Sequence, residues 1–97
     1  MRGVFEEPSV SDALDAACQR WARAVDAWEA ITWSVARDPE DETTPLSDDG
    51  LTRLLVSEGA ASIGWPTIAI VFEYDRRNIT ILDAQFSNAK AQQSGRA

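Results

Sequence analysis

The chain contains no histidine among its 97 residues and only one cysteine, Cys18. Without histidine it cannot form a Ser–His or Cys–His nucleophile pair, and it lacks the most common general base. A single cysteine allows no internal disulfide, which is typical of proteins from a reducing compartment, so we expect a cytoplasmic location. An enzyme of this sequence would have to use carboxylates, arginines, Lys90, Tyr74 or Cys18.

Long apolar runs and basic residues are also scarce. No stretch approaches the roughly 20 apolar residues that a membrane-spanning helix needs, and the first ten residues lack the apolar segment of a signal peptide. Nine Lys and Arg stand against 16 Asp and Glu, for a net charge of −7. Because nucleic-acid binding depends largely on neutralising phosphates, we expect such a chain to bind neither nucleic acid nor membrane. No pattern indicates a cofactor.

The first half of the chain carries a helical pattern. Apolar residues recur every three or four positions, which places them along one side of a helix; they are Leu14, Cys18, Trp21, Val25, Trp28, Thr32 and Val35. We predict from this stripe that Cys18, Trp21 and Trp28 are buried. A helix of about 25 residues would be about 38 Å long, which is long for so small a domain. The sequence therefore does not decide between one long helix and a pair of helices.

An acidic segment, DPEDETTPLSDDG at residues 38–50, follows the predicted helix. Its two prolines, one glycine and six acidic residues are typical of a solvent-exposed loop. The alternative is a calcium site, because Asp38, Glu40 and Glu42 alternate as ligands do in an EF-hand loop. However, Thr43 stands where that loop requires glycine. We therefore favour the solvated loop and predict no metal ion.

The second half changes to patterns typical of β-strands. Residues 51–57 form a short apolar strand candidate, and residues 67–74 (TIAIVFEY) are β-branched and aromatic, as in a central strand. Residues 79–84 (ITILDA) follow a polar turn and complete a hairpin. The sequence thus predicts an α+β domain, with an N-terminal long helix or helix pair packed on a small antiparallel sheet. This domain spans residues 1–86, and residues 87–97 form a flexible tail.

The hairpin predicts a register as well as a pair of strands. If Tyr74 pairs with Ile79, then Phe72 lies opposite Ile81 and Val71 opposite Leu82. The same register puts Asp83 on the apolar face, opposite Ile70. A carboxylate there indicates either an exposed strand end or part of a site, and the exposed end is favoured because charged residues are rarely buried.

Three stretches carry a family resemblance: WARAVDAWEAITWSVARDP at residues 21–39, LTRLLVS at residues 51–57, and PTIAIVFEYDRRNITILDA at residues 66–84. In this order they resemble a helix, a strand and a C-terminal hairpin of the RelE/ParE superfamily of toxins from toxin–antitoxin systems. The resemblance implies a helix pair on a small antiparallel sheet, with residues 2–6 as an additional strand. It also implies a protein partner, an antitoxin that wraps the toxin.

The resemblance further implies activities and candidate residues. RelE-like members are described as ribosome-dependent ribonucleases and ParE-like members as gyrase poisons, and both are usually basic, whereas this chain is acidic. Arg53 lies in the strand where the family often has an arginine, and Arg76 and Arg77 lie in the hairpin turn. No Tyr or His follows Tyr74, so RNA cleavage lacks a proton-transfer partner. No catalytic residue is predicted, and enzymatic activity is not favoured.

Two tryptophans, Trp33 and Trp65, are further candidate binding residues beside the three arginines. Trp33 points about 100° away from the apolar stripe on an ideal helix, which suits an interface or partial exposure. Trp65 precedes Pro66 and either covers the sheet edge or belongs to a binding loop. The predicted function is a toxin-like protein that acts through contacts with a protein partner or as a homodimer. The alternative is a small acidic adaptor domain with a basic protein partner.

The protein is expected not to bind single- or double-stranded nucleic acid at physiological salt. The reason is its net charge of −7 and the scattering of its basic residues along the chain. Fluorescence anisotropy with labelled oligonucleotides measures this. Micromolar binding that weakens steeply with added salt would contradict the prediction.

Overall fold

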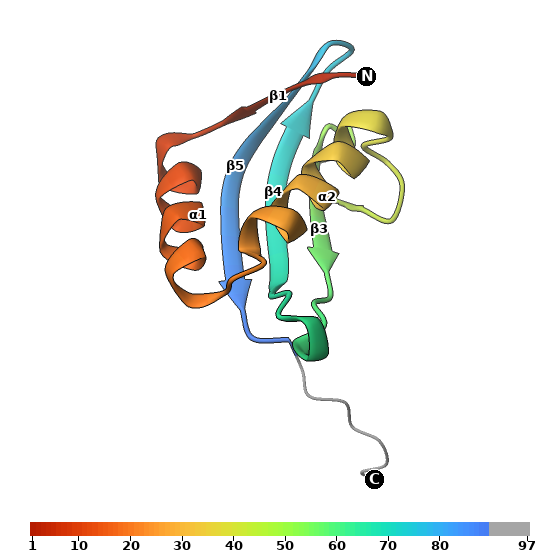
Figure 1. The fold of residues 1–97 in the computed structure, drawn as a ribbon. Helices are drawn as coiled ribbons and strands as arrows, with labels where there is room; N and C mark the ends of the chain where they lie inside the picture. Colours follow the sequence, from red (N-terminus) through yellow and green to blue (C-terminus); the bar gives the residue numbers. More distant parts are fainter. Residues whose placement is uncertain (90–97) are drawn as a thin grey trace, which may run out of the picture.

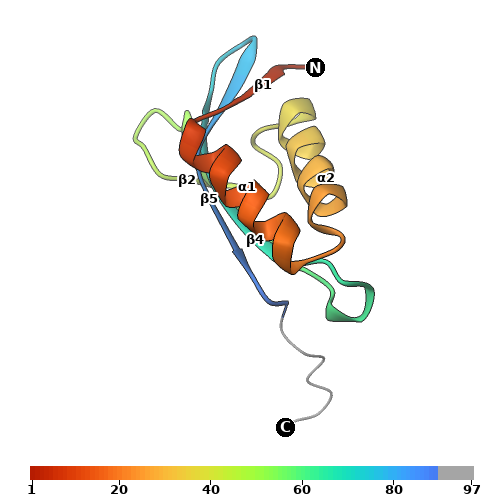
Figure 2. The ribbon, with the colours of Figure 1, turned by 60° about the vertical axis from the view of Figure 1, so that its left-hand side comes forward.

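The structure, a computed structural model, describes residues 1–89. Two helices lie on one face of a five-stranded sheet (Figures 1 and 2). The strands are β1 (Gly3–Glu6), β2 (Thr44–Pro45), β3 (Thr52–Ser57), β4 (Thr67–Tyr74) and β5 (Asn78–Ser87); the helices are α1 (Pro8–Arg20) and α2 (Ala24–Arg37), with a short 3-10 helix at Ala61–Ile63. The predicted α+β class, with N-terminal helices packed on a mostly antiparallel sheet, is confirmed.

The helical region forms a pair that breaks at Trp21. This residue is extended (φ −125°, ψ 120°), and its backbone N–H still donates to the Ala17 carbonyl at the end of α1. A continuous helix over residues 8–37 would be about 45 Å long, which exceeds the longest dimension of the molecule, 41 Å. The break lets α2 turn back across the sheet beside α1 (Figure 2).

The break also changes which side chains are buried. Burial of Cys18 and Trp21 is a wrong prediction: Cys18 is exposed, and Trp21 is half-buried with its ring 6.5 Å from that of Phe86. Val25 is exposed as well. The single stripe fails because the extended Trp21 interrupts the helical periodicity, so each helix has its own buried face. The residues that they bury are Val10 and Ala17 in α1, and Ala24, Ala27, Trp28, Ile31, Val35 and Ala36 in α2.

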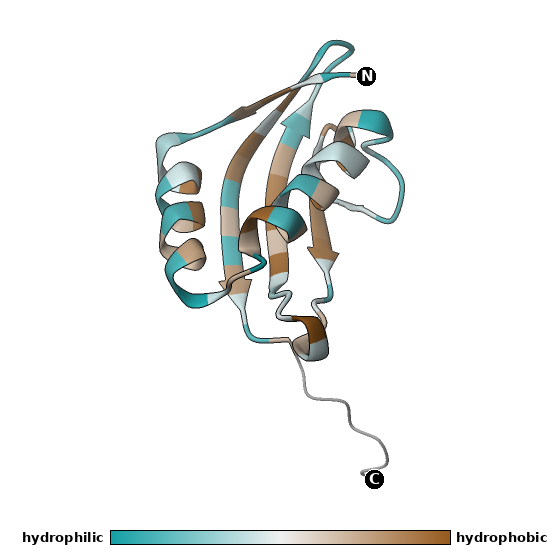
Figure 3. Ribbon diagram, viewed as in Figure 1, coloured by the Kyte–Doolittle hydropathy of each residue, from teal (hydrophilic) through white to brown (hydrophobic). Residues whose placement is uncertain are grey.

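The sheet has the strand order β1-β5-β4-β3-β2. The strands β2 to β5 form an antiparallel meander, and β1 runs parallel to β5 at one edge. β4 alternates between half-buried and buried residues from Thr67 to Phe72, and Glu73 is exposed; Figure 3 shows hydrophobic and hydrophilic bands following one another on the strands. This alternation is what a sheet with helices on one face requires.

The predicted hairpin register holds for the half nearest the turn. Tyr74 pairs with Ile79 and Phe72 with Ile81, as expected. A bulge next to Val71 then shifts the register, so Val71 faces Asp83 and not Leu82. Strand alternation alone could not show this shift, because a bulge inserts one residue into one strand only.

The bulge also overturns the predicted position of Asp83. Ala84, and not Asp83, lies opposite Ile70 and is buried, while Asp83 is exposed. A slip of one residue moves every later side chain to the other face of the sheet. The shift therefore removes a carboxylate from the apolar face, where ionisation would be costly.

One core lies between the helices and the sheet. Its largest fully buried side chains come from β4 and β5; they are Phe72, Ile68, Ile70, Ile79 and Ile81. Trp28 is the largest contribution from the helices and is only 5% exposed. Its ring lies 5.7 Å from that of Phe86, and its Nε1 donates a hydrogen bond of 3.1 Å to Glu6 of β1.

The described residues form a single unit around this core. β5 continues to Ser87, one residue past the predicted domain boundary. Of the predicted flexible tail, residues 90–97 lie outside the described part of the chain. Within residues 1–89, no helix is both long and apolar enough to cross a membrane.

Trp28→Ala is expected to lower the free energy of unfolding by about 3–5 kcal/mol, because it leaves a large cavity and removes the hydrogen bond that Trp28 donates to Glu6. That loss is comparable with the whole stability of a small domain. Thermal and urea denaturation measure it. Trp33→Ala, at a tryptophan that is 53% exposed, is the matched control and should cost less than about 1 kcal/mol. Equal melting temperatures for the two variants would contradict the proposed core.

Candidate protein-binding site

The strand β3 has an edge that the rest of the chain covers only in part. β2 pairs with Arg53 and Leu54 of β3, and the Leu46 N–H donates to the Thr52 carbonyl at 2.7 Å. Backbone groups alternate in direction along an antiparallel strand. Because Thr52 and Leu54 face β2, the N–H and C=O of Val56 face the same side, where no strand pairs with them among residues 1–89.

The early end of β2 has a local cause. If the pairing of Thr44 with Leu54 continued by two residues, Glu42 would lie opposite Val56. Glu42 instead has φ 60°, the left-handed conformation that a residue with a side chain rarely adopts. This turn carries the chain away from β3 and leaves the Val56 edge open. Backbone strain of this kind is concentrated at functional sites.

A groove runs beside this open edge, between β3 and α2. Its volume is about 440 Å³, and its lining residues are Ala30, Ile31, Ser34, Asp41, Glu42, Leu55, Val56, Ser57 and Glu58. The strand side is apolar, with Val56 49% exposed. Three carboxylates stand around it, and none of the lining residues is basic. We call this feature, the open edge with its groove, the acidic edge groove.

Arg53 holds the acidic loop against β3. Its Nε donates to the Thr43 hydroxyl at 2.6 Å, and its two terminal nitrogens donate to the carbonyls of Gly50 and Thr43 at 3.0 and 3.2 Å. The position predicted as a ligand contact thus spends its donors within the protein. Arg53 thereby supports the acidic edge groove, because it fixes Thr43, which directly follows Glu42.

A second contact anchors the same loop. The Tyr74 hydroxyl donates a hydrogen bond of 2.5 Å to Glu40, and this contact with a carboxylate raises the pKa of Tyr74 above its usual value. Glu40 also donates its backbone N–H to Asp38. Two of the carboxylates considered for calcium, Asp38 and Glu40, are thus engaged in these contacts. Residues 1–89 contain no group of three acidic or sulfur ligands placed to hold a metal ion.

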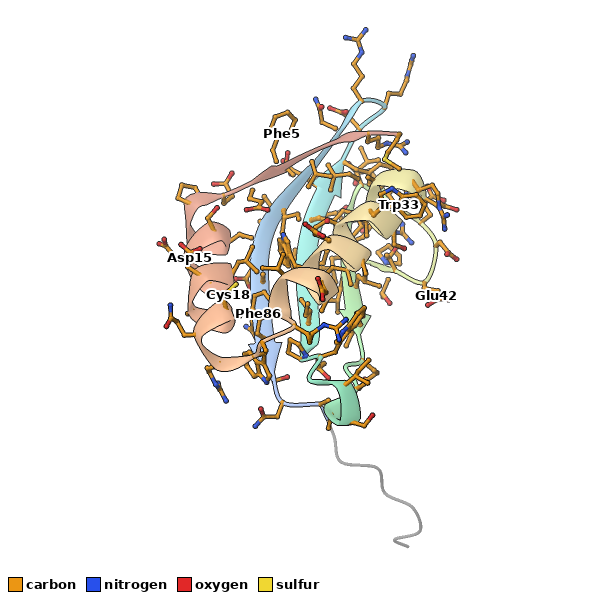
Figure 4. All side chains as sticks on the ribbon, viewed as in Figure 1. Phe5, Asp15, Cys18, Trp33, Glu42 and Phe86 are labelled. Carbon is orange, nitrogen blue, oxygen red and sulfur yellow. The ribbon has the colours of Figure 1, made fainter. Side chains whose placement is uncertain are left out.

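Trp33 lies on the outward side of α2, as the stripe predicts, and is 53% exposed. The Arg37 guanidinium stacks over its ring at 4.5 Å. Figure 4 shows Trp33 and Glu42 on the same side of the molecule. Trp33 does not line the acidic edge groove, but it is an exposed aromatic on the helix that forms one wall, and such residues are frequent anchors of protein interfaces.

Trp65 and the hairpin arginines lie away from this groove. Trp65 is half-buried beyond the far end of β3, packs against the core, and leaves its Nε1 buried without a partner in the described structure. Arg76 and Arg77 lie at the opposite end of the sheet, in the turn between β4 and β5. The predicted binding residues therefore do not form one site.

The sequence also missed part of the groove. Ala30 and Ser34 line the groove from α2, but these small, uncharged residues do not differ in the sequence from ordinary helix surface. The only signals available were the acidic loop and the unusually apolar run Leu54, Leu55 and Val56. Comparisons with protein-family models, curated proteins and solved structures found no match to this chain.

Arg53→Ala is expected to release the acidic loop and lower the free energy of unfolding by about 1–3 kcal/mol, since three hydrogen bonds from a charged, partly buried group are lost. Hydrogen exchange at the Leu46 amide should speed up markedly, because this amide reports β2 pairing. Arg76→Ala, at an exposed turn, is the control for charge and should leave both quantities almost unchanged. Unaltered Leu46 protection in Arg53→Ala would contradict the anchoring role.

Proposed function

We propose that this protein is a toxin-like component of a toxin–antitoxin pair that acts through protein–protein contacts, and that its partner binds at the acidic edge groove. The observation that carries the proposal is the open Val56 edge of β3 beside an acidic groove. An unpaired strand edge accepts an extended segment of another chain through backbone hydrogen bonds.

The arrangement of elements supports the family part of the proposal. The resemblance to RelE/ParE toxins implies a helix pair on a small sheet and an additional strand at residues 2–6. Both features are present as α1, α2 and β1. The mostly antiparallel sheet ends in the β4–β5 hairpin, which is the third part of the resemblance.

Charge supports the chemistry of the partner. Asp41, Glu42 and Glu58 line the groove, so a basic segment would gain attraction on approach and in the bound state. An acidic partner would meet three like charges at the same place. Val56, which is 49% exposed, supplies an apolar side chain that an added strand can contact on one face of the sheet.

The groove does not favour RNA as the ligand. Its lining residues include three carboxylates and no cation, whereas a cleavage site must neutralise a phosphate and transfer a proton. We therefore propose a role without nuclease activity at this groove. A small acidic adaptor domain is the second candidate, and it shares the basic partner; growth inhibition by the free protein separates the two.

Expression of the protein alone is expected to arrest growth of its host, and co-expression with the neighbouring open reading frame is expected to relieve it. The two products should co-purify as a complex. Val56→Pro should abolish that complex, because it removes the backbone N–H that faces the open edge while proline is tolerated at such an edge position.

Val56→Thr is the matched control, since it keeps the N–H and the β-branched shape and should still bind. Circular dichroism must show both variants folded. A complex that survives Val56→Pro would refute binding at this edge. Complex formation without growth arrest would favour the adaptor, and the absence of both arrest and complex would refute the toxin–antitoxin proposal.

A further inference from the structure

A pocket lies at the end of the sheet around the β4–β5 turn. It has a volume of about 580 Å³ and is lined by Arg2, Leu51, Tyr74, Asp75, Arg76, Arg77 and Asn78. This volume is in the range of small-molecule sites, about 300–1,000 Å³. None of these residues lines the acidic edge groove, so the two features are independent.

The charge of this pocket is opposite to that of the chain. Three of the nine basic residues of a chain with net charge −7 line it. Arg2 and the turn arginines come from opposite ends of the sequence, and β1 brings them together: it lies beside β5, and the Gly3 N–H donates to the Arg77 carbonyl at 2.9 Å. Only the tertiary structure creates this concentration of positive charge.

Arg2 is held in place before any ligand arrives. Its Nε donates to the Asp75 carbonyl at 2.6 Å, and its guanidinium stacks over the Tyr74 ring at 5.3 Å. Neither contact uses its terminal nitrogens, which are the bidentate donors of an arginine. Such preorganisation lowers the entropic cost of binding an anion.

The one carboxylate in the lining is held by the hairpin turn through one of its oxygens. The Oδ1 atom of Asp75 accepts the backbone N–H groups of Arg77 and Asn78, both at 2.8 Å, and these two donors lower the pKa of Asp75. The two N–H dipoles offset part of its negative charge. The pocket lining carries three positive charges and one negative, a net charge of two.

An acidic hollow next to the pocket limits where an anion can lie. That hollow is lined by Asp49 and Glu73 among others, and it shares four residues with the pocket: Leu51, Tyr74, Asp75 and Asn78. An anion is therefore confined to the arginine side. Leu51, which is 42% exposed, and the Tyr74 ring provide the apolar surface for a carbon body attached to it.

We propose that this pocket binds a phosphomonoester carried on a small organic group. The dianion matches the net charge of the lining, and its three terminal oxygens match several guanidinium donors better than a carboxylate or a phosphodiester does. The apolar wall selects for the organic group over inorganic phosphate.

The probe is phenyl phosphate, followed by amide chemical shifts of the whole protein at neutral pH. Saturable shifts are expected at Leu51, Tyr74 and Asn78, and not around the acidic edge groove. Benzenesulfonate and a phenyl phosphodiester, which carry one charge, should bind roughly tenfold more weakly, because a charge-assisted contact is lost. Inorganic phosphate should also bind more weakly than phenyl phosphate.

Arg76→Ala and Arg77→Ala should each weaken binding of phenyl phosphate by roughly tenfold, and Arg77→Lys should restore part of it. Arg20→Ala is the control, because it removes the same charge from the end of α1, where Arg20 stacks on Trp21. An equal loss in Arg20→Ala would show nonspecific attraction and overturn the proposal. So would the absence of saturable shifts at millimolar ligand, or tighter binding of a single-stranded oligonucleotide than of phenyl phosphate.

Discussion

The position of Trp28 holds the two layers of this protein together. Its indole packs against Phe86 of β5, and its Nε1 donates to Glu6 of β1, so one side chain of α2 reaches both strands at that edge of the sheet. The hydrogen bond removes the cost of burying the indole N–H, and the ring supplies the largest apolar contact of the helices. The break at Trp21 depends on the same packing, because α2 can meet β1 and β5 only after turning back from α1.

Both outer strands of the sheet that results cover their neighbours only in part. β1 pairs with four of the ten residues of β5, and β2 pairs with two of the six residues of β3. At the β3 edge the cause is the left-handed turn at Glu42, which removes the chain from the strand just before it would reach Val56. Anchors from Arg53 and Tyr74 keep the loop in that position.

Two surfaces of the protein differ in the sign of their charge. The acidic edge groove lies beside β3, and the pocket lined by Arg2, Arg76 and Arg77 lies at the turn between β4 and β5. The net charge of −7 does not show this difference, because it does not show that Arg2 lies near Arg76 and Arg77. The two proposed ligands, a basic chain and an organic phosphate, differ in charge as these two surfaces do.

The sequence by itself determined the helical first half, the strands β3, β4 and β5, and the part of the core that β4 and β5 supply. The continuous apolar character of residues 67–74 and the polar turn after them defined the hairpin, and Tyr74, Ile79, Phe72 and Ile81 pair as that pattern requires. The position of Trp33 on the outer side of its helix also follows from helical spacing alone. These features depend on local periodicity, which a sequence displays directly.

Only the tertiary structure decided the rest. The bulge that moves Asp83 out of the core and the break that exposes Cys18 are responses to packing over the whole domain, and neither is marked by glycine or proline at its position. Arg53 anchors the acidic loop because its donors meet Thr43 and Gly50 in three dimensions. Both candidate sites join residues that are distant in the chain, and such meetings are set by strand order and chain reversal, which local periodicity does not encode.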